Sequence, residues 1–283
     1  MRFIRYEDET GTVRHGALQR DGSALRIAGD IFGSFEVTQE PATATRILAP
    51  VAPTNILGIG RNYRPPGQMG RDQQLDYPIV FMKATTAVIG PGAPILLPRH
   101  LPSDDVRYEG ELAVVIGRRC KNVPRDRAFD YVFAYTCAND LTARDWQGRC
   151  GGQWWRAKSF DTFAPLGPCL VGLDEIADPS ALKIRTTSNG TLVQDGSTAD
   201  MIFDVPALIE FLSGETTLLP GTVILTGTPP FSAAMPASSA SLKPGDVIAV
   251  EITGIGTLTN SVAAEDWYSP PTGGAAGRIS QEP

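Results

Sequence analysis

The apolar residues of this chain fall into short runs that are separated by Gly or Pro. Such runs are typical of β-strands, because an amphipathic helix needs a longer stretch with a period near 3.6. The chain has 29 glycines and 23 prolines among 283 residues, and many of them lie between these runs. The main runs are 78–83, 111–117, 131–140, 169–173, 182–190, 222–227 and 246–254. The sequence therefore predicts a β-dominated α+β fold with few helices.

Two segments predict helices. In the segment 204–214, Val205, Leu208, Ile209 and Leu212 recur at helical spacing. The segment 141–148 follows a β run directly and is the second predicted helix.

The chain divides into three predicted parts. Residues 1–50 contain short β runs at 2–7, 12–19 and 24–29, which predict a small β-rich N-terminal domain. Residues 51–268 predict the main domain. Residues 269–283 lack the apolar side chains needed for packing and predict a flexible tail.

The charge pattern excludes several classes of partner. The net charge is −6, with acidic and basic residues mixed along the chain, so no basic stripe indicates nucleic-acid binding. No apolar run approaches the ~20 residues of a membrane span, and the N-terminus does not look like a signal peptide. The four cysteines form no Cys-x-x-Cys pair, which indicates reduced thiols and a cytoplasmic protein.

Two glutamates stand two residues apart in an expected strand, at 107–117. Glu109 and Glu111 would project side by side on one face, and Gly110 between them would allow close approach of another backbone on the other. Two adjacent carboxylates repel each other unless a cation or a proton lies between them. The alternative is a solvated edge strand that carries two surface glutamates.

A third carboxylate lies where the β run 131–140 passes into the predicted helix. Asp140, Arg144 and Gln147 are spaced i, i+4 and i+7, which predicts one shared helical face if the helix begins at Asn139-Asp140. The alternative is that Asp140 is only an N-cap with Arg144 as its ion-pair partner.

Several motifs in one order resemble the fumarylacetoacetate hydrolase family. They are GIGRNY (58–63), PIVFMK (78–83), YEGELAVVIG (108–117), NDLTARDWQ (139–147), KSFDTFAPLGP (158–168), an Asn-Gly with a following Gln (189–194), LLPGTVILTGTP (218–229) and LKPGDVIAVEITGIGTLTN (242–260). This resemblance implies a mixed β-roll or sandwich catalytic domain and a homodimer. It also implies a divalent cation bound by Glu109, Glu111 and Asp140. Carboxylate oxygens favour Mg²⁺, with Mn²⁺ or Ca²⁺ as substitutes.

The resemblance also implies a substrate and the residues that bind it. Family substrates are typically 2-oxo acids or 1,3-dicarbonyls, whose carbonyls a metal can polarise so that an enolate forms. Catalytic side chains would be Lys158, Arg144 and Gln147, and substrate-binding side chains would be Thr228, Tyr63 and Lys83. The alternatives are a surface lysine at 158, a turn residue at 228, and packing or solvation at 63 and 83.

The chain departs from hydrolytic relatives in a lid segment that follows Asn62-Tyr63. Those relatives carry a His and, three residues later, a Glu that activate water, whereas Pro66 and Met69, or Gln68 in another alignment, stand here. His100 is expected to be a loop residue. A second departure, Pro230-Phe231, indicates a pocket for a bulkier or more apolar substrate.

Three functions stay open at this point. The first is a non-hydrolytic enzyme that uses an enolate, as a tautomerase, isomerase, cyclase or decarboxylase. The second is a C–C bond hydrolase of the acylpyruvate or fumarylacetoacetate type in which Asp72 or Asp76 replaces the missing pair. The third is a non-catalytic binding protein that retains the metal site.

Overall fold

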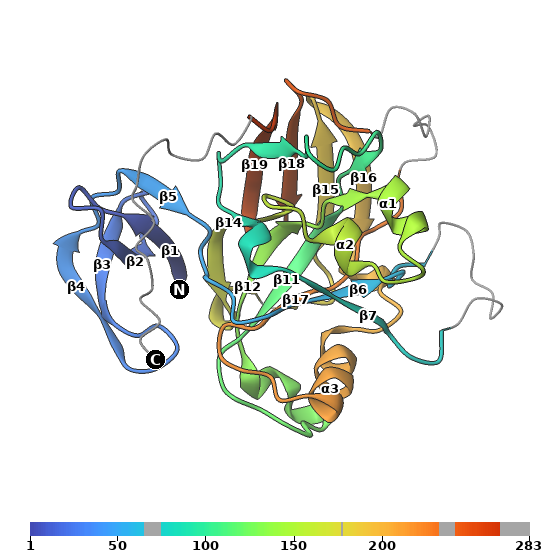
Figure 1. The fold of residues 1–283 in the computed structure, drawn as a ribbon. Helices are drawn as coiled ribbons and strands as arrows, with labels where there is room; N and C mark the ends of the chain where they lie inside the picture. Colours follow the sequence, from blue (N-terminus) through green and yellow to red (C-terminus); the bar gives the residue numbers. More distant parts are fainter. Residues whose placement is uncertain (65–74, 177, 232–240, 267–283) are drawn as a thin grey trace, which may run out of the picture.

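The computed structural model describes residues 1–64, 75–176, 178–231 and 241–266. Strands dominate it, as the sequence predicted, and they form one long mixed sheet, a five-stranded sheet and a two-stranded pair. In Figure 1 the five-stranded sheet stands above the long sheet, and helix α3 lies below it. The predicted tail 269–283 lies outside the described residues.

The long sheet begins in the N-terminal part of the chain. Its first strands are β1 (Arg2–Glu7), β2 (Val13–Leu18), β3 (Ala24–Gly29), β4 (Phe35–Pro41) and β5 (Arg46–Leu48). The three predicted strands agree with β1 to β3, while β4 and β5 were not predicted. Strand β1 pairs with β14 through Arg2↔Val171 and Phe3↔Leu170, so the N-terminal lobe at the left of Figure 1 shares a sheet with the main body. A domain boundary near residue 50 stays a prediction.

The main body completes the long sheet in the order β14-β12-β11-β17-β6-β7. These strands are β6 (Ile56–Gly60), β7 (Ile79–Lys83), β11 (Gly110–Ile116), β12 (Val132–Asn139), β14 (Ala164–Gly172) and β17 (Val223–Leu225), and β8 (Val88–Ile89) pairs with β14. Neighbours in this part are antiparallel except two pairs that run parallel, β17 with β6 and β14 with β8.

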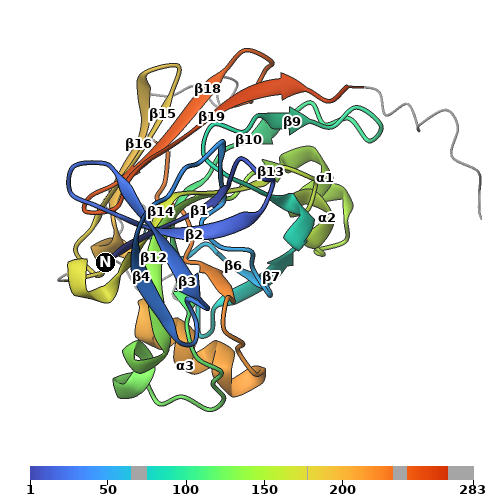
Figure 2. The same cartoon turned by 90° about the vertical axis from the view of Figure 1, so that its left-hand side faces the viewer.

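The second sheet has the order β16-β15-β18-β19-β9. Its strands are β9 (Ile95–Leu97), β15 (Lys183–Ser188), β16 (Thr191–Ser197), β18 (Val247–Ile252) and β19 (Gly256–Ala264), and the pair β10 (Val106–Arg107) and β13 (Thr142–Ala143) stands apart. Figure 2 shows β15, β16, β18 and β19 together on one side of the molecule.

Helices in the described part of the chain are few and short. They are α1 (Arg144–Arg149), α2 (Trp155–Lys158) and α3 (Val205–Glu215), with 3-10 turns at Thr85–Ala87, Arg125–Tyr131, Leu173–Glu175 and Thr198–Asp200. Helix α3 buries Val205, Leu208, Ile209 and Leu212, which is the face that the sequence predicted. Asp204 caps it by accepting a hydrogen bond from the Ala207 N–H. No helix in the described residues is long and apolar enough to cross a membrane.

Strand β11 is buried on both faces, which explains why its sequence is apolar without alternation. Leu112, Val114 and Ile116 pack in a core with residues of α3 and the five-stranded sheet. Ala113 and Val115 pack on the opposite face, in a core shared with the N-terminal strands. The strand that begins at the paired glutamates is therefore held rigidly from both sides.

Candidate metal centre and substrate cavity

Three carboxylates from neighbouring strands converge at one end of β11 and β12. Glu109 directly precedes β11, Glu111 is its second residue, and Asp140 directly follows β12, which pairs with β11 through Gly110↔Asn139. All three are buried, and each offers an oxygen within 4.8 Å of the others. The residues expected to bind a metal therefore lie together, and their role as ligands stays a prediction. The surface-edge alternative for the two glutamates is wrong, because both faces of β11 are covered.

The predicted helical face needs a correction. Helix α1 begins at Arg144, not at Asn139-Asp140, because Thr142 and Ala143 are extended and pair with β10. Asp140 is thus neither on the helix nor its N-cap. Arg144 and Gln147 do face each other, with Arg144 Nη1 donating to Gln147 Oε1 at 3.0 Å. Arg144 Nη2 donates to Glu109 Oε1 at 2.7 Å, so its partner is not Asp140.

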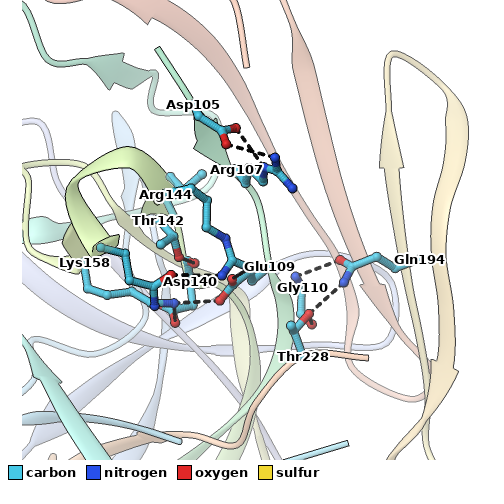
Figure 3. A network of polar contacts seen from close by, with 12 residues as sticks. Asp105, Arg107, Glu109, Gly110, Asp140, Thr142, Arg144, Lys158, Gln194 and Thr228 are labelled. Atoms are coloured by element: carbon cyan, nitrogen blue, oxygen red, sulfur yellow. Dashed lines mark hydrogen bonds and ion pairs between the residues drawn. The ribbon is translucent and has the colours of Figure 1, made fainter. Parts of the chain in front are cut away.

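Lys158 lies between two of the carboxylates. Its side chain comes from α2 and is 3% exposed, so the surface-lysine alternative is wrong. Figure 3 shows its ammonium contacting Glu109 and Asp140, with 2.6 Å from Nζ to Glu109 Oε2. Burial alone would lower the pKa of Lys158, but Asp140 and Glu109 outweigh it and raise that pKa.

Lys83 supports Asp140 from the other side. It is fully buried at the end of β7, and its Nζ donates to Asp140 Oδ1 at 2.5 Å and to Leu141 O at 3.1 Å. Burial lowers the pKa of Lys83 despite this neighbour. For Asp140, burial would raise the pKa, but the two lysines lower it, so the carboxylate stays charged. Lys83 does not line the cavity, and its geometry is that of a buried partner of Asp140.

Glu111 is different, because it has no ion pair among the residues that the structure describes. Its carboxylate Oε2 accepts one hydrogen bond, from Gly227 N–H at 2.8 Å. Burial and the nearby Asp140 raise the pKa of Glu111 well above its usual value. A buried carboxylate without a compensating charge is costly, and a divalent cation among the three carboxylates would compensate it. The donor set therefore fits a hard divalent cation.

A cavity of about 530 Å³ opens beside the carboxylates. Eight of the nine predicted site residues line it: Tyr63, Glu109, Glu111, Asp140, Arg144, Gln147, Lys158 and Thr228. Burial and the negative Glu111 raise the pKa of Tyr63, whose hydroxyl has no hydrogen-bond partner among the described residues. That hydroxyl is therefore a protonated group able to contact a ligand.

The apolar wall of the cavity comes mostly from residues that the sequence did not single out. Trp154 packs against Phe81 with ring centroids 5.6 Å apart, and both line the cavity. Phe231, from the Pro230-Phe231 segment that departs from the family, lines it too. Its ring meets that of Tyr108 edge to face, with centroids 5.5 Å apart. Nothing in the spacing of these aromatic residues distinguishes a cavity wall from ordinary packing.

Two buried amides behind the carboxylates were also not assigned a role from sequence. Asn139 Oδ1 accepts a hydrogen bond from Glu109 N–H at 2.9 Å, and Gln194 Oε1 accepts one from Gly110 N–H at 3.0 Å. Strand β11 begins only at Gly110, although the sequence predicted a continuous strand over 107–117, because these side chains replace the strand pairing there. Asn139 stands directly before Asp140, which is the one signal that could have indicated it.

The two histidines lie away from the cavity. His15 is on β2 in the N-terminal lobe, and His100 is in an exposed loop as predicted. Most of the lid segment, with Pro66, Gln68, Met69 and Asp72, lies outside the described residues. Asp76 is described, is exposed and does not line the cavity.

Comparison with known families gives two matches that together span most of the chain. Residues 55–263 match the family "Fumarylacetoacetate (FAA) hydrolase C-terminal", and residues 1–50 match "Rv2993c-like, N-terminal".

Named relatives include enzymes of different reaction types. "Oxaloacetate tautomerase fahd2, mitochondrial" from Xenopus laevis is 44% identical over 247 residues, which are 87% of this chain and 76% of that protein. The structure of "5-carboxymethyl-2-hydroxymuconate delta-isomerase" from Mycobacterium smegmatis is 39% identical, with a TM-score of 0.81 over 94% of this chain and 100% of that one. Maleylpyruvate hydrolase from Sphingobium sp. SYK-6, solved with manganese(II) and pyruvate, is 26% identical, with a TM-score of 0.73 over 94% and 100% of the chains.

The family match covers well over half of the chain, and the fold and the order of the motifs agree with it. This chain belongs to the fumarylacetoacetate hydrolase family.

Proposed function

We propose that this protein is a divalent-cation-dependent tautomerase or isomerase of a 2-oxo acid or β-dicarbonyl, with Mg²⁺ as the expected ion. The observation that carries the proposal is the position of Lys158. Its buried ammonium stands against Glu109 and Asp140, in the same cavity as Glu111 and Arg144. Cationic groups placed beside an acidic metal set suit a substrate oxygen that becomes negative during the reaction.

A cation held by Glu109, Glu111 and Asp140 would supply a Lewis acid that polarises the carbonyl oxygens of the substrate. Lys158 would stabilise negative charge on the substrate oxygen nearest to its ammonium. Arg144, whose side chain is 36% exposed at the cavity, would bind the substrate carboxylate. Gln147 accepts a hydrogen bond from Arg144 and thereby orients the guanidinium. Tyr63 offers its unpartnered hydroxyl as a donor to the substrate.

The reaction class follows from what the sequence lacks. Hydrolysis needs a group that activates water, and the segment after Tyr63 contains neither His nor Glu up to Gly70. Neither histidine of the chain lines the cavity. Tautomerisation needs no activated water, because a proton only leaves the carbon beside the carbonyl while another is added to the oxygen. The names of the Xenopus and Mycobacterium smegmatis relatives, a tautomerase and an isomerase, support this choice.

Oxaloacetate and acetylpyruvate are the substrates with which to test the proposal. We expect the protein to accelerate loss of the C3 proton signal of either compound in D₂O, followed by proton NMR, in Mg²⁺ but not in EDTA. No acetate or pyruvate should accumulate from acetylpyruvate. Mg²⁺-dependent appearance of acetate and pyruvate would instead establish the C–C hydrolase. Tight metal binding without any turnover would favour the binding protein.

Lys158→Met tests the residue that carries the proposal. Removing one preorganised cation from a site of developing negative charge costs about 100-fold to 1,000-fold in kcat. Lys183→Met is the matched control, because Lys183 is exposed on β15 and its loss should leave kcat unchanged. A Lys158→Met protein that is folded and fully active would rule out this role.

The homodimer and the cytoplasmic location stay predictions.

A further inference from the structure

Gln194 lies behind the carboxylates, outside the cavity, on strand β16 of the five-stranded sheet. Its side chain is fully buried. The amide Nε2 donates to Thr228 Oγ1 and to Pro229 O, both at 2.7 Å, and Oε1 accepts from Gly110 N–H at 3.0 Å. Both donors and the acceptor of this amide are therefore used.

These contacts close into a ring with Thr228 (Figure 3). Thr228 Oγ1 accepts from Gln194 and donates to Gly110 O at 2.9 Å. The N–H and the C=O of Gly110 are thus both bound by side chains that come from outside strand β11. Gly110 joins Glu109 to Glu111. The ring therefore fixes the backbone segment that carries both carboxylates.

Gly110 is what allows a neighbouring side chain of the second sheet, Thr186, to come this close. A Cβ at this position would lie 2.1 Å from Thr186 Oγ1 and 3.4 Å from Gln194 Oε1. The sequence predicted close approach of another backbone on this face of Gly110. Side chains of the second sheet approach it instead.

We propose that Gln194 is a positioning residue, which sets the spacing of the Glu109 and Glu111 carboxylates for the metal and fixes the direction of the Thr228 hydroxyl. The metal part of this inference rests on the proposed function. Hydrogen-bonded groups behind metal ligands commonly contribute 10-fold to 100-fold to metal affinity, because they hold the ligands in a productive orientation.

The ring also defines what Thr228 offers to a substrate. A hydroxyl has one proton and two lone pairs, and here the proton points to Gly110 O while one lone pair accepts from Gln194. Thr228 is left with one lone pair. It therefore accepts a hydrogen bond from a protonated substrate oxygen, such as an enol hydroxyl, and does not donate one.

The test is Mn²⁺ affinity of the full-length protein, measured by calorimetric titration after treatment with EDTA and its removal. Gln194→Met keeps the length of the side chain and removes its polar atoms. We expect the Kd for Mn²⁺ to rise about 10-fold to 100-fold. Asn260→Leu is the matched control, since this buried amide on β19 also donates to two backbone carbonyls, Gly90 O and Ala93 O. It should lower Tm and leave the Kd unchanged.

A double-mutant cycle separates positioning from general stability. If Gln194 and Thr228 act as one ring, Thr228→Val in the Gln194→Met background should raise the Kd little further. Thr228→Ser retains the hydroxyl and should keep the wild-type Kd. These two variants of Thr228 also carry the test if Gln194→Met does not fold: a Kd that rises with Val and not with Ser supports the ring.

A Gln194→Met protein with a lower Tm and a wild-type Kd would overturn the proposal, as would strictly additive effects in the cycle. The outcome is separable from that of the proposed function. A wild-type protein that binds Mn²⁺ but turns over no dicarbonyl leaves the positioning role intact, whereas one that binds no Mn²⁺ refutes both.

Discussion

At the residue scale, Glu111 makes the sharpest prediction, because it is a buried carboxylate without an ion pair among the described residues. Glu111→Gln keeps the shape and removes the charge. In EDTA we expect unfolding by urea to require more denaturant, with a gain of about 1–3 kcal/mol, since Gln removes the cost of burying this carboxylate as a charge or of protonating it. Affinity for Mn²⁺ should fall more than 10-fold. Glu251→Gln, on the exposed face of β18, should change neither quantity. A less stable Glu111→Gln protein in EDTA would show that the charge is already compensated.

The residues of the site differ in how well the sequence predicts them. Glu109 and Glu111 stood out because residues two apart on a strand share a face, which is a local property. The grouping of Asp140 with them as a metal site came from the family resemblance. The burial of Lys83 and the contacts of Gln194 are not local. Lys83 meets Asp140 across 57 positions, through the order of strands in the long sheet. Gln194 meets Gly110 across 84 positions, through the packing of the second sheet on the first.

At the element scale, the loop before α2 packs the ring of Trp154 directly on the backbone of strand β6 at Gly60. A Cβ at Gly60 would lie 2.3 Å from the ring of Trp154, which lines the cavity. Gly60→Ala should therefore displace Trp154, raise KM several-fold and shift the tryptophan fluorescence. Gly214→Ala is the contrasting variant, because a Cβ there meets nothing within 4 Å in helix α3. It should stabilise the protein by about 0.5–1 kcal/mol and leave KM unchanged. An unchanged KM and spectrum for Gly60→Ala would refute this account of the cavity wall.

The predicted elements agree with the structure where the segment with a regular apolar spacing is long. The position of helix α3 was predicted from its regular apolar face alone, and the structure adds a cap at Asp204 and a proline in its first turn. The start of α1 was misplaced, because the pairing of Thr142 and Ala143 with β10 is a tertiary contact that overrides a helical spacing of Asp140 and Arg144.

At the scale of the whole molecule, the question is whether the N-terminal lobe and the main body unfold together. Strand β1 pairs with β14, the terminal ammonium binds Asp174 and Glu175, and Arg2 donates to Glu175, Ile255 O and Gly254 O. These contacts join a lobe that carries no metal ligand to a body that carries all three candidates. We therefore expect one calorimetric transition, although the sequence predicted a boundary near residue 50.

Metal addition tests this coupling directly, because an ion that binds only the folded state stabilises everything that unfolds with its site. At an Mn²⁺ concentration of about 100 times Kd, the gain is about 2.7 kcal/mol, and the single transition should move upward as a whole. Arg2→Met removes three of the joining contacts. It should weaken the coupling, so that unfolding of the N-terminal lobe begins to separate as a second transition that does not respond to metal. Two transitions in the unaltered protein, of which only one responds to Mn²⁺, would instead establish residues 1–50 as an independently folding domain, and the shared sheet would then be an interface and not a common core.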